Sequence, residues 1–483
     1  MNSLFLFLLI GAVWNSSPAW AMAHRPPVDK PAPVERGTPS APLSLEDCYE
    51  LALKRSETVA IQKEDIKEAE AQFFIAASEA LGDVHFVMDR TFQEDLKGGG
   101  DTSSTGRSST DPDKRERRIV ITQPLFQGFK ALGALIGAGS LRKEQKEEWL
   151  RAQELLFLDV VQAYYGFLKE KKDLETIDGI YSLYKERVRE LEEREAIGRS
   201  RTSEVITAKA RMKTLEAERA HVRGTLSVSR SVLEFLTGIK WEGQTLSDEP
   251  VSEEPPQELY AYLTKVDERS DVEGARQAVK TAKQGILVAQ SQFWPELSIE
   301  NNQYIRREGL QSNIDWDLLF KIDVPLFQGG EAIGNVKKAV SGWKKKKLNY
   351  SKVRREAELE IKKHYENWLA SVSEARSLGE AVKASEENFR LQKEDYSHNL
   401  VSNLDVLEAL QELLQTRRDA NRAHYEMKQH YWAFQVSTGD LDGLAPSLRA
   451  SRSEAKQSQK RQIASAIPGA LPRNDAAREP RFP

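Results

Sequence analysis

The sequence has few of the features that mark disulfide-linked, metal-binding or nucleic-acid-binding proteins. Its 483 residues include one cysteine, Cys48, which excludes an internal disulfide. The seven histidines form no ligand pattern, so we expect no metal site, no cofactor and no enzymatic activity. A formal net charge of −4 gives no sign of a nucleic-acid partner. No segment after residue 23 has 18 consecutive apolar residues, so any membrane-spanning part must be built from strands.

Proline is missing from two long stretches, 125–249 and 326–445. Such stretches, rich in Glu, Lys, Arg, Ala and Leu, predict long helices. Each stretch is interrupted once, near 196–204 and near 397–405. The helices are therefore expected at about 128–196, 202–238, 330–398 and 402–438. At 1.5 Å per residue, each of the longer helices spans about 100 Å, which is more than a compact domain needs.

The ends of the chain differ in composition from its middle. Residues 4–14 are apolar and lead to small-residue cleavage sites after Ala21 or Ala23, so we expect a secretory signal peptide over 1–23, although "MNS" carries no Lys or Arg. No cysteine follows these sites, which argues against a lipoprotein. The flanking and connecting segments are a Pro-rich stretch at 24–42, a linker at 239–256 and a tail at 446–483 that we expect to be disordered.

Two halves of the chain resemble each other, which predicts a tandem repeat over 43–238 and 257–445. The pentapeptide "PLFQG" occurs at 124–128 and again at 325–329, an offset of 201 residues. Upstream, "KRSETV" faces "ERSDVE" at an offset of 214. The difference falls in the Gly/Ser/Thr/Asp-rich segment 97–113, which predicts an exposed hairpin loop at that place in the first copy.

A strand of membrane-spanning length is expected at 314–324, where every second residue is apolar. Its apolar row, expected to face lipid, includes Trp316, Leu318, Phe320 and Ile322, whereas Lys321 lies on the other face. With strands at about 84–92, 116–124 and 296–305, each chain has four strands, too few to close a barrel. Three chains would supply 12 strands. On spacing alone, a soluble coiled-coil protein with a small hairpin cap explains the pattern equally well.

Three features together resemble the TolC-like outer-membrane efflux channel family over about 43–445: the segment 43–72, the paired "PLFQG", and "YSHNLVSNLDVLEAL" at 396–410. The resemblance implies a mainly α fold with a small β part, in which long helical hairpins form an α-barrel in the periplasm. Four strands per chain would join a 12-strand β-barrel of a homotrimer in outer-membrane lipid. It also implies an exit duct for efflux of small molecules or type I protein secretion, with a periplasmic adaptor and an inner-membrane transporter as partners. A soluble periplasmic adaptor or coiled-coil scaffold is the alternative function.

The resemblance places functional residues at the tips of the long helical hairpins. The acidic entrance pair of the family matches Asp405 and Glu408, which are spaced to share one helix face. A solvated helix face would show the same spacing. Tyr396 and Glu204 match a hydrogen-bonding pair of the closed state, and the family's tip arginine falls on Val401, which cannot donate. The residues expected at the tip turns and in adaptor docking are Gly198, Arg199, Arg201, Asn399, Leu400 and Val401.

Overall fold

The computed structural model describes residues 42–92, 113–241, 245–255, 257–308 and 312–439. The expected signal peptide, nearly all of the Pro-rich segment and of the loop at 97–113, and the tail at 446–483 lie outside the described residues. The elements below all belong to the unit that begins at Leu43.

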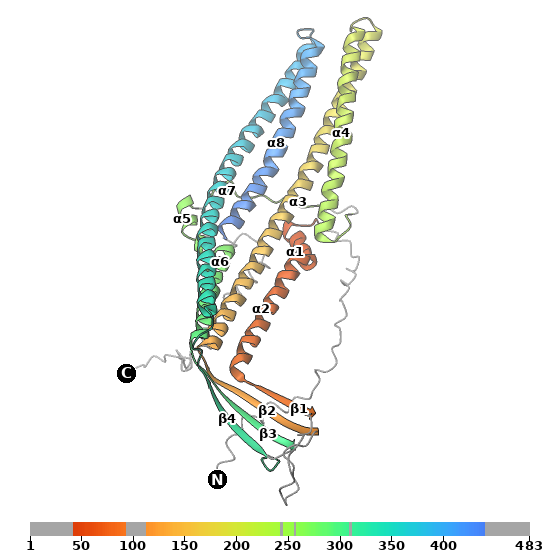
Figure 1. Cartoon of the computed structure of the whole chain (residues 1–483). Coiled ribbons are helices and arrows are strands. Elements are labelled where there is room, and N and C mark those ends of the chain that lie inside the picture. Colours follow the sequence, from red (N-terminus) through yellow and green to blue (C-terminus); the bar gives the residue numbers. More distant parts are fainter. Residues whose placement is uncertain (1–41, 93–112, 242–244, 256, 309–311, 440–483) are drawn as a thin grey trace, which may run out of the picture. The chain divides into compact units, whose positions relative to one another are not determined.

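Long helices dominate the structure, as the sequence predicts (Figure 1). In the first half α1 (Leu45–Arg55) and α2 (Glu57–Leu81) precede the sheet, and α3 (Lys130–Ala196) and α4 (Thr202–Thr237) follow its first hairpin. In the second half the corresponding helices are α5 (Leu259–Leu263), the 3-10 turn η1 (Val266–Glu268), α6 (Ser270–Gln290), the 3-10 turn η2 (Ser291–Phe293), α7 (Glu331–Ser397) and α8 (Asn403–Thr438). Helices α3 and α7 both have 67 residues, and α4 and α8 both have 36. The long helices of the two halves therefore match in length.

Four antiparallel strands form one sheet in the order β1-β2-β3-β4. They are β1 (Asp83–Phe92), β2 (Asp113–Gln127), β3 (Glu296–Arg307) and β4 (Trp316–Asp323). The sheet lies at the end of the long helices opposite to the α3–α4 and α7–α8 turns (Figure 1). Strands β1 and β4 are its edges, so each has one side without a hydrogen-bonded neighbour in the sheet.

The repeat offset of 214 upstream of the strands is wrong by one residue. Ser56 and Arg269, which are 213 residues apart, are the N-cap residues of α2 and α6. The strand register gives the same offset. Val84 pairs with Ile121 in the first half and Leu297 pairs with Ile322 in the second, so Val84 and Leu297 are 213 residues apart while Ile121 and Ile322 are 201 apart. The offset of 214 aligns the identical "RS" dipeptides of the two halves. In the structure, however, α2 begins after the serine and α6 begins after the arginine.

Helices α2, α3, α6 and α7 lie side by side in that order next to the sheet (Figure 1). Helix α3 thus contacts α2 on one side and α6 on the other, while α2 and α7 are at the two edges. Within the described part of the chain, no helix combines the length and the hydropathy needed to cross a membrane.

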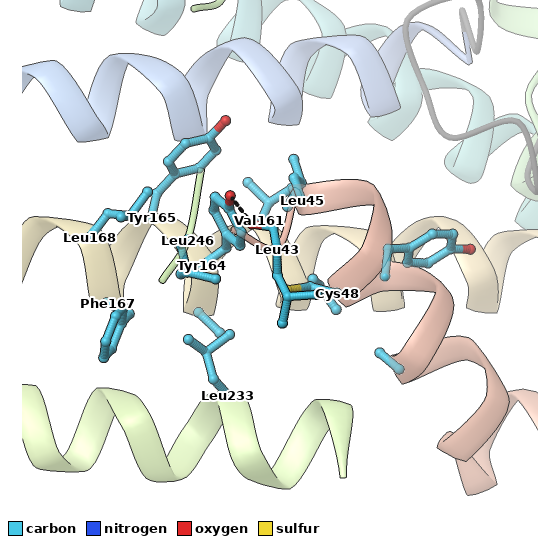
Figure 2. Close-up of a cluster of buried hydrophobic side chains, with 14 of the residues drawn as sticks. Leu43, Leu45, Cys48, Val161, Tyr164, Tyr165, Phe167, Leu168, Leu233 and Leu246 are labelled. Atoms are coloured by element: carbon cyan, nitrogen blue, oxygen red, sulfur yellow. Dashed lines mark hydrogen bonds between the residues drawn. The ribbon is translucent and has the colours of Figure 1, made fainter. Parts of the chain in front are cut away.

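One buried cluster joins both halves of the chain at the level of α1 (Figure 2). Leucines and aromatic residues of α3 pack against α1, α4 and Tyr425 and Val436 of α8. The Tyr164 hydroxyl donates to the Leu43 carbonyl at 3.0 Å, which fixes the start of the described segment on α3. Cys48 is fully buried here, and burial raises the pKa of its thiol to about 12, so it remains protonated.

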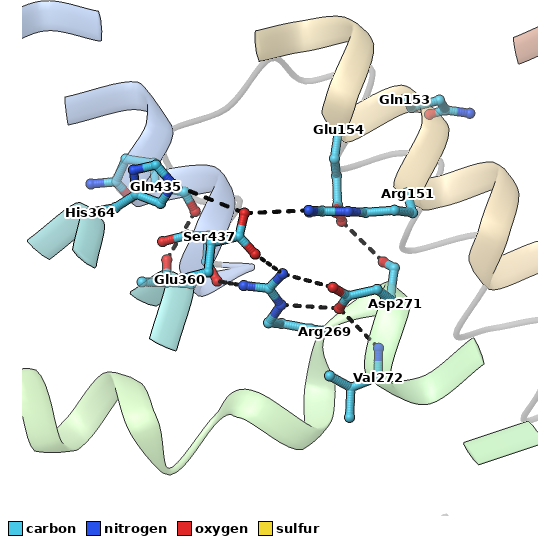
Figure 3. Close-up of polar contacts among 12 residues, drawn as sticks. Arg151, Gln153, Glu154, Arg269, Asp271, Val272, Glu360, His364, Gln435 and Ser437 are labelled. Atoms are coloured by element: carbon cyan, nitrogen blue, oxygen red, sulfur yellow. Dashed lines mark hydrogen bonds and ion pairs between the residues drawn. The ribbon is translucent and has the colours of Figure 1, made fainter. Parts of the chain in front are cut away.

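A buried ionic network ties α6 to α7, α8 and α3 (Figure 3). The Arg269 side chain is only 2% exposed and contacts the Asp271 carboxylate at 2.7 Å and the Glu360 carboxylate at 2.6 Å. It also donates to the Ser437 carbonyl at 2.6 Å. The Ser270 hydroxyl reaches Glu154 of α3 at 3.0 Å. Because the charges are matched and hydrogen-bonded, the network can be buried.

Candidate functional site

The two faces of the sheet differ in polarity, with most of the apolar side chains on one of them and a few polar residues such as Asn301 among them. In the strand register, Leu318 of β4 lies beside Asn301 of β3, then Ile121 of β2 and Val84 of β1. Directly paired residues of antiparallel strands point to the same side, so the apolar row of β4 continues as Ile121 and Val84. The predicted row is exposed in the chain: Trp316 59%, Leu318 44%, Phe320 66% and Ile322 66%. The alternation predicted from the sequence therefore extends across the sheet.

The opposite face carries a connected set of polar side chains. Asp317 of β4 accepts from the Asn302 amide at 2.9 Å and from the Tyr304 hydroxyl at 2.8 Å. Tyr304 is paired in register with Arg118 of β2, which contacts Glu116 at 2.7 Å. Lys321 lies on this face as well, because it is one residue out of phase with the apolar row.

The helix tips turn through left-handed backbone positions. Gly198, at the α3–α4 turn, has φ +73°, and Asn399, at the α7–α8 turn, has φ +60°. Asparagine is one of the few residues that adopts this conformation readily, as expected from its place in the sequence. Leu400 and Ile197 beside these turns are 73% and 66% exposed, so each tip carries an apolar side chain in solvent.

Asp405 and Glu408 are both exposed near the start of α8, but Asp405 has a structural role that sequence spacing did not show. Its carboxylate accepts from the Ser402 backbone N–H at 2.8 Å and from the Ser402 hydroxyl at 2.7 Å, which makes a capping box. These hydrogen bonds hold the pKa of Asp405 below its usual range. Carboxylates of neighbouring copies brought close to Asp405 would shift its pKa in the opposite direction. Replacing Asp405 by alanine would remove this cap as well as the charge.

Tyr396 and Glu204 have different partners within the chain. Glu204 belongs to the cap of α4, where its carboxylate accepts from the Ser200 hydroxyl at 2.6 Å. The Tyr396 ring is 7% exposed and lies under the guanidinium groups of Arg187 and Arg194, at 3.8 and 4.6 Å. Among the hydrogen bonds of the described residues, none joins Tyr396 to Glu204. Val401, at the position of the family's arginine, is half-buried against the apolar cluster of the tips.

Arg187 is a residue that sequence reasoning missed. Its side chain is 5% exposed, its Nε donates to the Asn403 Oδ1 at 2.9 Å, and its Nη1 contacts Glu190 at 2.7 Å. It therefore connects α3 both to the end of α7, through Tyr396, and to the start of α8. No motif in the sequence joins these positions, which are more than 200 residues apart.

Comparisons with known proteins agree with this architecture. The family model of the outer membrane efflux protein matches residues 266–440. The alkaline protease secretion protein AprF of Pseudomonas aeruginosa is 20% identical, covering 73% of this chain and 76% of that protein. The outer membrane protein TolC of Vibrio cholerae is 19% identical, covering 69% and 78%. The crystal structure of VceC from Vibrio cholerae has a TM-score of 0.70 at 21% identity, covering 82% of this chain and 96% of that one.

Long helical hairpins that carry a four-stranded sheet are the fold of the outer-membrane channels to which the chain is similar, a class of transport proteins rather than enzymes. Over residues 266–440 the chain matches the outer membrane efflux protein family, and its fold is that of the TolC-like channels, which combine a helical barrel with a β-barrel. It is an outer-membrane exit duct with its helical part in the periplasm. TolC-like channels are trimeric and work with efflux pumps or secretion systems. The soluble adaptor or scaffold considered from the sequence finds no support.

Proposed function

We propose that three copies of this chain form the duct, with the apolar face of each sheet toward lipid and the polar face toward the lumen. The observation that carries this proposal is the register, which places apolar side chains of all four strands on one side. Strands that cross a membrane as part of a water-filled barrel alternate in this way. The Asp317–Asn302–Tyr304 set would then line the lumen and give a polar surface to cargo.

At the other end, we infer that Asp405 and Glu408 of the three copies form acidic rings at the entrance. Both side chains are exposed at the first turns of α8, near the tip. Carboxylate rings at a narrow pore attract cations and repel anions. Since Asp405 also caps α8, part of each charge is already stabilised by Ser402, and Glu408 is the less constrained member of the pair.

The tips are also the proposed contact for a periplasmic adaptor, which would join the duct to an inner-membrane transporter. Leu400 and Ile197 project apolar surface at the two turns, and Arg199 and Arg201 add positive charge beside the first turn. Such exposed apolar residues with a charged rim fit a protein contact.

The cargo is either small molecules or a type I secreted protein. Deleting the gene and profiling which toxic compounds or exported proteins depend on it separates the two.

Recordings from single channels in planar bilayers test the acidic entrance. We expect multivalent cations to block wild type and to block Asp405→Asn/Glu408→Gln far less. Asparagine at 405 retains an oxygen that can accept from Ser402, so it preserves the cap better than alanine would. Glu216→Gln, on the exposed surface of α4, is the matched control and should be blocked like wild type. Equal block in all three proteins would refute the acidic entrance while leaving the duct itself intact.

A further inference from the structure

Two arginines, Arg117 of β2 and Arg306 of β3, are paired in register on the face of the sheet that carries the apolar row. Arg117 is in phase along β2 with Ile119 and Ile121, and its partner on β1 is Met88. Both arginines are exposed. Like charges directly opposite each other disfavour strand pairing, so the arrangement calls for a partner outside the sheet.

A β-bulge places Arg306 on this face. Arg118 of β2 pairs with Tyr304 of β3. The preceding residue of β2, Arg117, pairs with Arg306, so Ile305 is an extra residue in β3. Without the bulge, Arg306 would be in phase with Tyr304 and would point to the polar face. The bulge therefore brings the second arginine beside the first on the apolar face.

The length of β2 gives the level of the two arginines in the membrane. Phe126 is on the same face near the helices, where its ring lies 6.4 Å from that of Trp294, and such aromatic residues flank the apolar band of a membrane barrel. Arg117 is nine positions away along β2, which is about 30 Å of strand. At a tilt of about 40°, this is about 23 Å along the membrane normal, close to the height of the apolar band. The arginines thus lie at the outer boundary of the band, at the end of the sheet away from the helices (Figure 1).

Positive charge gathers around this pair. Arg90 and Arg115 are paired with each other in the next row outward, in phase with Arg117. The Glu308 carboxylate accepts from the Arg306 Nε at 2.9 Å and from the Arg115 backbone N–H at 2.8 Å. Within the part of the chain that the structure describes, Arg117 has no carboxylate partner. An anion between Arg117 and Arg306 would remove the repulsion between them.

Lipid is the surrounding that this face meets in the proposed assembly. Strands β2 and β3 are the inner strands of the sheet, so neighbouring copies can join only at β1 and β4 and leave the arginines uncovered. Phe86 and Met88, on the membrane side of the pair, and Trp316 at the start of β4 are exposed apolar side chains. A ligand that fits has an anionic group at the boundary and hydrocarbon below it.

We propose that Arg117 and Arg306 bind the phosphate group of a lipid in the outer leaflet, whose acyl chains lie along the apolar face over Met88 and Phe86. The planar guanidinium group can donate two parallel hydrogen bonds to one phosphate, which suits arginine better than lysine to this position. The inference rests on the proposed duct, which turns this face toward lipid, and it adds a specific lipid site to that duct.

Binding of lipopolysaccharide, a phosphorylated outer-leaflet lipid, to the purified full-length trimer in detergent tests the site. We expect wild type to bind it more tightly than the same lipid with its phosphates removed. Arg117→Gln/Arg306→Gln should bind it about tenfold more weakly than wild type, because charge-assisted hydrogen bonds are lost. Arg117→Lys/Arg306→Lys should be intermediate, since the charge remains without the paired donors.

Lys114→Gln is the matched control, because Lys114 is at the same end of β2 but, paired with Thr91, on the polar face. It should bind like wild type. Equal binding of the two lipids to wild type would overturn the inference without relying on any variant. Equal binding of lipopolysaccharide to wild type and Arg117→Gln/Arg306→Gln, with unchanged single-channel conductance, would overturn it and spare the duct. Loss of binding in Lys114→Gln alone would mean that the polar face meets lipid, and would overturn the proposed orientation of the sheet as well.

Discussion

The tip contact of Arg187 gives a sharp test of how the duct stays closed. Arg187 links α3 to Tyr396 at the end of α7 and to Asn403 at the start of α8. If the hairpins separate at their tips when the channel opens, this contact is lost in the open state. We therefore expect Arg187→Gln to shift the equilibrium toward the open channel.

The magnitude follows from the two guanidinium interactions that leave α3, those with Tyr396 and Asn403, because the contact with Glu190 lies within α3. A cation over a desolvated aromatic ring contributes about 2 kcal/mol. Glutamine can still donate to Asn403, so part of the hydrogen-bond energy remains, and the net loss is about 2 kcal/mol per chain. Because 1.4 kcal/mol is a factor of ten, this corresponds to about 30-fold in the closed-to-open equilibrium of each tip.

Single-channel conductance and open probability in planar bilayers measure this shift. The matched control is Arg189→Gln, since Arg189 is 81% exposed and contacts only Glu193 of its own helix among the ion pairs of the described residues. Tyr396→Phe keeps the ring and should behave like wild type, whereas Tyr396→Leu should open the channel like Arg187→Gln. Equal conductance in Arg187→Gln and Arg189→Gln would refute the role of this contact. A large effect of Tyr396→Phe would instead favour a hydrogen bond of its hydroxyl, as the family resemblance implied.

Further predictions concern the sheet, the buried network and the cap of α8. Phe320→Arg should make the free energy of assembly in the membrane less favourable by about 2–4 kcal/mol if the site is near the bilayer midplane, and it should reduce the amount of heat-resistant trimer on gels. Lys321→Leu should assemble normally. The reverse result would mean that the two faces are assigned the wrong way round. Arg269→Met leaves Asp271 and Glu360 without their buried partner, so the free energy of unfolding should fall by about 3–5 kcal/mol in denaturant titrations, and an unchanged midpoint would contradict the network's role. Because the folded-state pKa of Asp405 is lowered, its contribution to the cap is complete above the unfolded-state value of 3.8 and is lost as pH falls through the folded-state pKa. The protection of amides in the first turn of α8 against exchange, relative to the intrinsic rate at each pH, should therefore fall below about pH 4 in wild type but not in Asp405→Asn.

The long helices could be predicted because their signal is local. The segment expected at 128–196 is observed as Lys130–Ala196, and that expected at 402–438 as Asn403–Thr438. Absence of proline and a uniform helix-forming composition act residue by residue, and glycine at the end stops the helix. Gly238 follows α4 with φ +77° and Gly439 follows α8 with φ +65°, both in the left-handed region. The short elements α5 and η1 had no comparable signal and were not predicted.

The functional site was harder to predict from the sequence than the helices, for two different reasons. The cap of α8 could be predicted, since Ser402 followed three residues later by Asp405 is a capping-box pattern. From the sequence, Asp405 was interpreted only as a charge at the pore entrance. The stacking of Arg187 on Tyr396 could not be predicted from the sequence, because it depends on how two helices pack against each other and follows from no local pattern. A single sequence also cannot show that the first half must be shifted by one residue to match the second.

The equal lengths of α3 and α7, and of α4 and α8, restrict how the protein can change in evolution. Adding one heptad to a single hairpin would lift its tip about 10 Å above the other, because each residue adds 1.5 Å along the axis. The entrance would then lose half of its wall at that level, and the packing of every neighbouring helix would slip. An insertion is tolerable only when its equivalent arises in the other half, or when it falls between β1 and β2, where the first half is already longer. The length of the duct across the periplasm is thus set by both halves of the sequence, and it can change only when both change together.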